Sequence, residues 1–179
     1  MQQINLHHRK LIRLKEYNYA LPGEYFVTIC THNHECTLGE ILDGEMRLNE
    51  IGKIVEKCWK KIPSHFINME LGEFVVMPNH LHGIIIINEQ VEHIKTNIHV
   101  GVQNFEPLQL GSIIRSYKAA VTRECRHCRY QDFRWQRNYY EHIIRSDKEL
   151  NNIREYIVNN PMQWHVDEEN PVKDDQMAI

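Results

Sequence analysis

The chain has 179 residues, of which 42% are hydrophobic, and its formal net charge is -3. This length and composition suit one globular domain with a sizeable core. No apolar stretch is long enough to cross a membrane, and the N-terminal residues lack the apolar core and small-residue cleavage site of a signal peptide. We therefore expect a cytoplasmic protein whose five cysteines are reduced rather than joined in a disulfide framework.

Charged residues are distributed unevenly along the chain. The first fifteen residues carry four basic and no acidic side chains, whereas residues 165–179 carry five acids and one lysine. Between Ile113 and Arg145 there are eight Lys or Arg residues and three acids. Such segregation is what a polyanion-binding face needs, and it is compatible with an acidic total. A charged face that is merely solvated is the alternative.

The first third of the chain predicts a strand, a hairpin and a helix. Residues 25–31, YFVTICT, are mostly β-branched and aromatic, which is typical of a strand, and we expect this strand to be central. Residues 36–48 predict a small hairpin, because Asp43-Gly44 separates two strand-like halves. From Asn49 the apolar residues follow a helical period, with Asn49 as the N-cap and Pro63 as the stop.

The stretch from Glu73 to Asn88 reads EFVVMPNHLHGIIIIN and predicts two strands joined at Pro78-Asn79. Side chains alternate faces along a strand, so His80 and His82 share one side while Leu81 points to the other. Their bases lie about 6 to 7 Å apart, which lets both rings reach one metal ion. The turn signal before them indicates a strand edge that opens onto a cleft. Ordinary packing of the two histidines is the alternative.

A basic helix is predicted over residues 108–126, where apolar side chains at helical spacing form a buried side. The opposite side carries Arg115, Lys118 and Arg126, which suit contacts with phosphate groups. Residues 89–107, which precede this helix, have weak periodicity and many polar groups. We expect a mobile connection there.

Residues 133–142, FRWQRNYYEH, mix aromatic side chains with Arg134 and Arg137 and predict a strand with a loop before it. Aromatic faces stack on unpaired bases while guanidinium groups hold phosphates, so this segment suits a single-stranded nucleic acid. The alternative is that Trp135 and one of Tyr139 or Tyr140 fill the core.

The last predicted helix begins at the capping box Ser146-Asp147-Lys148-Glu149 and ends before Pro161. Tyr156 lies beside its buried stripe, and Asn160 follows four residues later on the same face. A tyrosine at the margin of a buried face is by itself more often packing than chemistry.

Two other classes of function fit parts of the sequence. Residues 125–128 read CRHC, and three more residues of metal-binding type lie upstream: His32, His34 and Cys36. Together they would form a structural zinc site in a nucleic-acid-binding module without catalysis. The second alternative is a metal-dependent hydrolase that uses the HLH histidines and water, with no covalent intermediate. The fate of the 5′ phosphate distinguishes that hydrolase from a covalent enzyme.

Four segments in this order carry a resemblance to a known family: VVMPNHLHGIIII, SYKAAVT, WQRNYYEHIIR and REYIVNNP. Together they resemble the single-tyrosine HUH transposases of the insertion-sequence-200-like superfamily. The YFVTICT strand and the context of the tyrosine near the end are most similar to the REP-associated tyrosine transposases. The resemblance covers residues 13–164, which is most of the chain.

This resemblance implies an α+β fold, a ferredoxin-like sandwich with a central antiparallel sheet and helices on one face. It makes residues 1–179 a single HUH transposase domain with flexible basic N-terminal and acidic C-terminal tails. The metal ligands then correspond to His80, His82 and Asn160, and the catalytic nucleophile corresponds to Tyr156. The implied reaction cleaves and rejoins hairpin DNA through a 5′-phosphotyrosine intermediate.

Two neutral imidazoles and an oxygen ligand leave coordination positions open on Mg²⁺ or Mn²⁺, which are the expected cofactors. The expected partner is single-stranded or hairpin DNA, with no membrane, and the protein acts as a monomer or homodimer. We expect four side chains to contact phosphates: Arg115, Lys118, Arg134 and Arg137.

Overall fold

The computed structural model describes residues 21–89 and 109–171. The expected basic tail lies outside these ranges, as do residues 172–179 of the expected acidic tail and nearly all of the expected connection 89–107. The described strands are β1 Gly23–Cys30, β2 Gly39–Leu42, β3 Glu45–Leu48, β4 Met69–Val76, β5 His80–Ile87 and β6 Tyr140–Ile144. The α-helices are α1 Glu50–Lys60, α2 Leu110–His127 and α3 Asp147–Asn159, and the short 3-10 helices are η1 His32–His34, η2 Ile62–Ser64 and η3 Pro161–Val166.

The central sheet has four strands in the order β4-β5-β1-β6, and every pairing in it is antiparallel. The strand predicted over residues 25–31 is therefore interior, as expected. β5 is also an interior strand, because it pairs with β1 on one side and β4 on the other. The HLH segment thus lies inside the sheet, and the expectation of an open strand edge there is wrong. The α+β class and the antiparallel sheet are confirmed.

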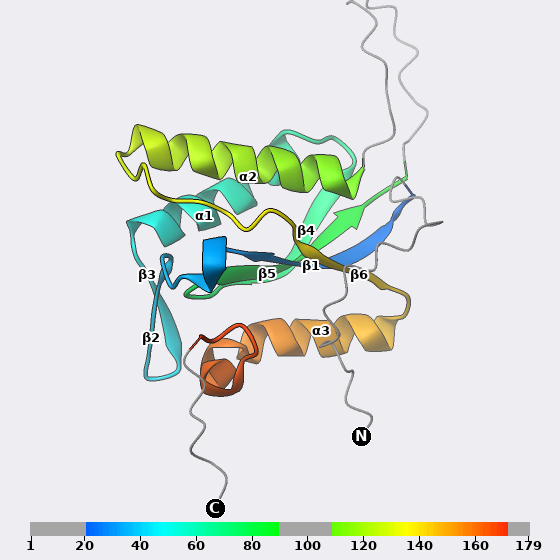
Figure 1. Ribbon diagram of the computed structural model, residues 1–179. Helices are drawn as coiled ribbons and strands as arrows, with labels where there is room; N and C mark the ends of the chain where they lie inside the picture. Colours follow the sequence, from blue (N-terminus) through cyan, green and yellow to red (C-terminus); the bar gives the residue numbers. More distant parts are fainter. Residues whose placement is uncertain (1–20, 90–108, 172–179) are drawn as a thin grey trace, which may run out of the picture.

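The helices cover both faces of the sheet (Figure 1). On one face, Tyr25, Val27 and Ile29 of β1 are fully buried in a large core that includes residues of α1 and α2. On the other face, Phe26 and Ile84 form a second core with Leu150, Ile153 and Ile157 of α3. The predicted one-sided arrangement therefore holds for α1 and α2, whereas α3 packs on the opposite face. Burial of each of the three α3 side chains is worth about 1.5 to 3 kcal/mol relative to exposure.

Local sequence signals fix the hairpin and the starts of two helices. Asp43 and Gly44 both have positive φ, 52° and 77°, which is the backbone that a two-residue hairpin turn needs. The Asn49 side chain accepts a hydrogen bond from the Gly52 amide at 2.9 Å and caps α1. Ser146 caps α3 in the same way through the Glu149 amide.

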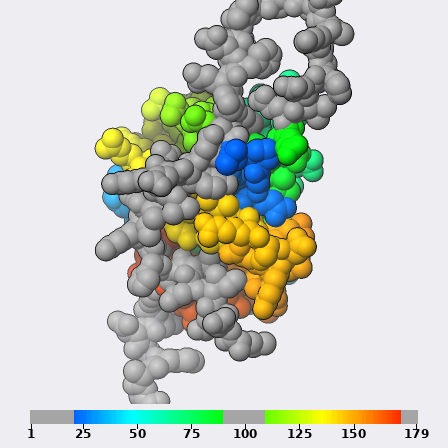
Figure 2. Space-filling view, turned by 90° about the vertical axis from the view of Figure 1, so that its right-hand side faces the viewer, coloured from blue at the N-terminus to red at the C-terminus, as the bar shows by residue number. Residues whose placement is uncertain are grey.

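The strand ends meet at one surface of the molecule. Gly23 at the start of β1 pairs with Ile87 at the end of β5, and Glu24 pairs with Ile144 at the end of β6. Figure 2 shows the blue start of β1 between the green and the gold segments on that face. Among the described residues, none of the helices has the length and apolar character to cross a lipid bilayer.

Gly83 allows α1 to approach the sheet beside the histidines. A Cβ atom on Gly83 would lie 2.4 Å from the Trp59 ring, which is fully buried. We expect Gly83→Ala to lower the free energy of unfolding by about 1 to 3 kcal/mol because the core becomes overpacked. Chemical denaturation measures this change. Gly23→Ala is the matched control, since its Cβ would meet only ordinary contacts at 3.6 Å. Equal stability of Gly83→Ala and the wild type would contradict the packing argument.

Candidate metal and nucleophile site

His80 and His82 lie side by side on the face of β5 that α3 covers. Their ring centroids are 4.4 Å apart. His80 is 0% exposed and His82 is 4% exposed. The sequence predicted this shared face from strand alternation. Their burial was not predicted, and it means that the pair lies beneath α3 and η3 rather than on an open surface.

The surroundings of His80 fix its tautomer. The Asn79 Nδ2 group donates hydrogen bonds to the carbonyls of His34 and Glu169, so its Oδ1 atom is the one that faces the imidazole. That oxygen lies 2.8 Å from His80 Nδ1 and accepts its hydrogen. Neutral His80 therefore carries its lone pair on Nε2. A ligating histidine is typically oriented in this way by a second hydrogen bond.

His82 has a corresponding arrangement. Its Nδ1 atom lies 2.8 Å from the buried Thr28 hydroxyl, and its Nε2 atom lies 3.2 Å from the Tyr156 hydroxyl. With Nδ1 protonated, Thr28 accepts a hydrogen bond and Nε2 accepts one from the phenol. The Phe26 ring stacks on the imidazole at 5.2 Å between centroids and holds its plane. In this tautomer the Nε2 atom of His82 is the one that faces α3.

Tyr156 reaches this site from α3, which brings together residues 74 positions apart. Burial raises the pKa of the phenol well above its ordinary value of 10, and the negative charges of Asp167 and Glu169 raise it further. A hydrogen bond from the Asn160 side chain opposes this shift. The phenol is therefore protonated at neutral pH, and its ionisation needs added positive charge nearby.

Asn160 remains helical despite the following proline, with φ -57° and ψ -41°. It is 1% exposed, and its Nδ2 group donates to Asp167 Oδ2 at 3.0 Å. Its Oδ1 atom is buried and has no hydrogen-bond partner within the described ranges. A buried amide oxygen without a partner costs free energy, which a bound cation would offset.

Asp167 is a candidate ligand that the sequence analysis missed. Its carboxylate and a nitrogen of each of His80 and His82 all lie within 4.8 Å of one another. η3 reverses the chain after α3, and the Glu169 amide donates to Asp167 Oδ1 at 2.7 Å. The only signal in the sequence was Pro161, which ends α3 and begins this return. Two imidazole nitrogens, an amide oxygen and a carboxylate fit a divalent cation such as Mn²⁺.

The four predicted phosphate-binding residues do not share one role. Arg115, Arg134 and Arg137 are exposed. Lys118 is half-buried and donates to the carbonyls of Gln136 and Asn138, both at 2.8 Å. Lys118 therefore ties α2 to the segment before β6, a structural task that periodicity alone did not indicate.

Several aromatic residues of the segment 133–142 take part in packing. Phe133 is 6% exposed, and Trp135 packs against both Phe133 and Tyr117. Tyr139 contacts the large core, while Tyr140 contacts the second one. The packing alternative for Trp135 and one tyrosine is therefore the observed arrangement.

The predicted zinc module does not assemble around the CRHC segment. Cys125 is completely buried in the core, whereas Cys128 is exposed at the end of α2. Neither cysteine belongs to a group of metal-ligating side chains in the part of the chain that the structure describes. His34 is instead close to Cys30 and Glu169.

Comparison with solved structures places this fold in a known class. The chain matches a REP-associated tyrosine transposase that was solved bound to a REP hairpin, with a TM-score of 0.57 and 21% identity. The match covers 83% of this chain and 72% of that one. The protein therefore has the fold of the REP-associated tyrosine transposases, which confirms the resemblance at the level of fold.

A second comparison establishes the family. The chain is 47% identical to an uncharacterized protein of Haemophilus influenzae (strain ATCC 51907 / DSM 11121 / KW20 / Rd) over 169 residues, or 91% of this chain and 93% of that protein. This protein belongs to the same family as that Haemophilus influenzae protein. No family model matches the chain.

The hydrogen bond from His82 to Thr28 gives a test of the metal site. Thr28→Val removes the hydroxyl that orients the imidazole, so we expect Mn²⁺ affinity to fall about 10- to 100-fold. Calorimetric titration measures this change. Thr122→Val is the control, because the Thr122 hydroxyl bonds only within α2, to the Lys118 carbonyl. Unchanged affinity in Thr28→Val would contradict the proposal that this hydrogen bond orients His82 for the ion.

Proposed function

We propose that this protein is a metal-dependent DNA endonuclease and strand transferase in which Tyr156 is the nucleophile. The observation that carries the proposal is the 3.2 Å contact between the Tyr156 hydroxyl and His82 Nε2. It brings the proposed nucleophile within hydrogen-bond distance of His82, whose ring centroid lies 4.4 Å from that of His80. A phosphodiester bound there would meet both groups at once.

The proposed reaction exchanges one phosphate ester for another. The Tyr156 oxygen forms a bond to phosphorus while the bond from phosphorus to the 3′ oxygen breaks. The phenol loses its proton, and the leaving 3′ oxygen gains one and becomes a 3′-hydroxyl. The 5′-phosphotyrosine keeps the energy of the ester, so attack by another 3′-hydroxyl reseals a strand without ATP.

The protein's own residues perform three tasks in this proposal. His80, His82, Asn160 and Asp167 hold the divalent cation. Mg²⁺ or Mn²⁺ supplies positive charge at the scissile phosphate. Asn160 favours the ionised phenol through its hydrogen bond, and burial excludes bulk water from the covalent intermediate.

The substrate that we propose is single-stranded or hairpin DNA. Three exposed arginines supply phosphate contacts: Arg115, Arg134 and Arg137. Lys118 orders the segment that carries the last two, through its hydrogen bonds to the Gln136 and Asn138 carbonyls. The structural relative is described as bound to a REP hairpin, which supports this choice of substrate. The whole chain, 1–179, is proposed to act as one domain in the cytoplasm, as a monomer or a homodimer.

A hydrolase that uses water as its nucleophile is the second candidate function. Removal of the Tyr156 hydroxyl oxygen distinguishes it from the covalent enzyme. Tyr156→Phe should preserve folding and DNA binding but lower cleavage of a hairpin oligonucleotide at least 10³-fold. It should also abolish the covalent adduct on a denaturing gel. Tyr140→Phe is the matched control, since Tyr140 packs in the same core as Tyr156. Cleavage by Tyr156→Phe at the wild-type rate would favour the hydrolase.

The substrate contacts are tested by the salt dependence of binding. Double replacement Arg115→Gln and Arg137→Gln should lower the log-log salt slope for single-stranded DNA by about 1.4, or about 0.7 for each lost contact. Fluorescence anisotropy over a salt series measures the slope. Arg47→Gln with Lys53→Gln removes the same charge from exposed positions on β3 and α1. If both double variants change the slope equally, the basic segment is not the DNA-binding face.

A further inference from the structure

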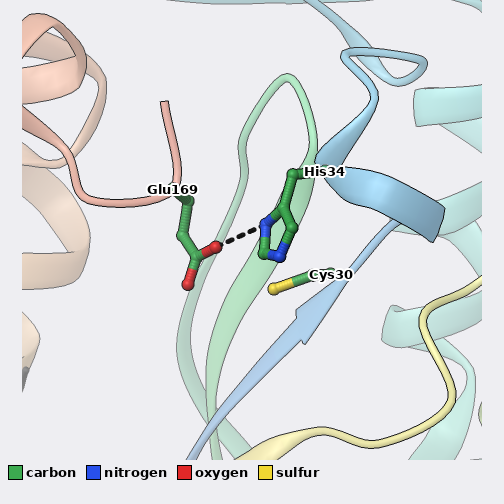
Figure 3. Close-up of side chains that lie close together, drawn as sticks. All are labelled: Cys30, His34 and Glu169. Carbon is green, nitrogen blue, oxygen red and sulfur yellow. Dashed lines mark ion pairs between the residues drawn. The ribbon is translucent and has the colours of Figure 1, made fainter. Parts of the chain in front are cut away.

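Three metal-ligating side chains meet at the end of β1, apart from the site of His80 and His82. Cys30 is the last residue of β1, His34 ends η1, and Glu169 lies in the segment after η3. One ligand atom from each lies within 4.8 Å of the other two. Figure 3 shows the His34 ring with the Glu169 carboxylate to its left and the Cys30 sulfur below it, and a dashed line marks the ion pair between His34 and Glu169.

The backbone around this cluster is held in an unusual conformation. Asn33 and His34 have positive φ, 52° and 55°, although neither is glycine. Such a conformation costs free energy and persists only where surrounding contacts hold it. Here the Thr31 hydroxyl bonds the Glu35 carbonyl, and the Asn79 side chain bonds the carbonyls of both His34 and Glu169. The Asn79 side-chain amide thus links the backbones of two of the three residues, His34 and Glu169.

The donor set is one thiolate, one imidazole and one carboxylate. Mg²⁺ and Ca²⁺ prefer oxygen ligands, whereas sulfur together with nitrogen is typical of zinc. Zinc ligands at bond lengths of about 2.0 to 2.3 Å lie roughly 3.3 to 3.8 Å from one another. The three donors therefore need only small side-chain movements, including release of the 2.6 Å pair between His34 Nδ1 and Glu169 Oε2.

Two of the three side chains in the cluster are largely buried. Cys30 is 9% exposed, and the Glu169 and His34 side chains are 10% and 29% exposed. The greater exposure of His34 leaves one side accessible to water as a fourth ligand.

We propose that Cys30, His34 and Glu169 form a second metal site, which binds zinc. The site fastens the segment after η3 to the end of β1. Because the Glu169 amide bonds the Asp167 carboxylate, zinc at this position also orients Asp167 beside His80 and His82. This inference does not depend on the proposed DNA cleavage.

Cobalt(II) is the probe, since it replaces zinc and reports its ligands by colour. Titration of the full chain with Co²⁺ should give a thiolate-to-cobalt charge-transfer band and the intense visible bands of a tetrahedral site. Zinc should then remove both. The site of His80, His82 and Asp167 contains no sulfur, so cobalt bound there cannot produce the charge-transfer band.

Substitutions identify the sulfur and its partners. Cys30→Ser should lose the charge-transfer band, while Cys36→Ser and Cys128→Ser should keep it, because those two exposed cysteines lie outside the cluster. His34→Gln and Glu169→Gln should weaken cobalt binding at least tenfold, and circular dichroism checks that each variant is folded. Absence of the band in the wild type would overturn the proposal and leave only an ion pair between His34 and Glu169. Persistence of the band in Cys30→Ser, or its loss in Cys36→Ser, would also overturn it.

Discussion

The two-residue alternation of β5 between two packed faces is the constraint on which the site depends. Leu81 and Ile85 are fully buried on the side of α1 and α2, so His80 and His82 must point towards α3. A shift of one residue in the pairing with β1 would exchange these sets and turn the histidines into the large core. The large core therefore holds the histidines in place, although it contains no atom of the site. α3 then has a fixed surface on which to place Tyr156.

Asn79 connects the two clusters of metal-ligating residues. Its side chain orients His80 through one atom and binds the carbonyls of His34 and Glu169 through another. Glu169 in turn donates to Asp167, which lies beside the histidines. The segment after η3 and the site are thereby linked by a few hydrogen bonds. The geometry makes the return of the chain after α3 part of the site.

Local signals in the sequence predicted much of the fold. The Asp43-Gly44 turn, the Asn49 and Ser146 caps and the shared face of His80 and His82 depend on neighbours within a few residues, and each is present as predicted. Contacts between distant segments were not predictable in this way. Asp167 lies beside the histidines only because η3 reverses the chain. Lys118 donates hydrogen bonds to carbonyls 18 and 20 residues further along the chain. Likewise, periodicity shows that a helix has an apolar side but not which face of the sheet it covers, so α3 was misplaced.

The central claim is that Tyr156 forms the bond to DNA. Trypsin releases residues 155–173 as one peptide, which contains Tyr156 as its single tyrosine, and residues 138–145 as another, which contains Tyr139 and Tyr140. Mass spectrometry of the protein after reaction with a hairpin oligonucleotide should find the DNA attached through its 5′ phosphate to the 155–173 peptide. Attachment to the 138–145 peptide, or cleaved DNA with a free 5′ phosphate and no modified peptide, would contradict the account.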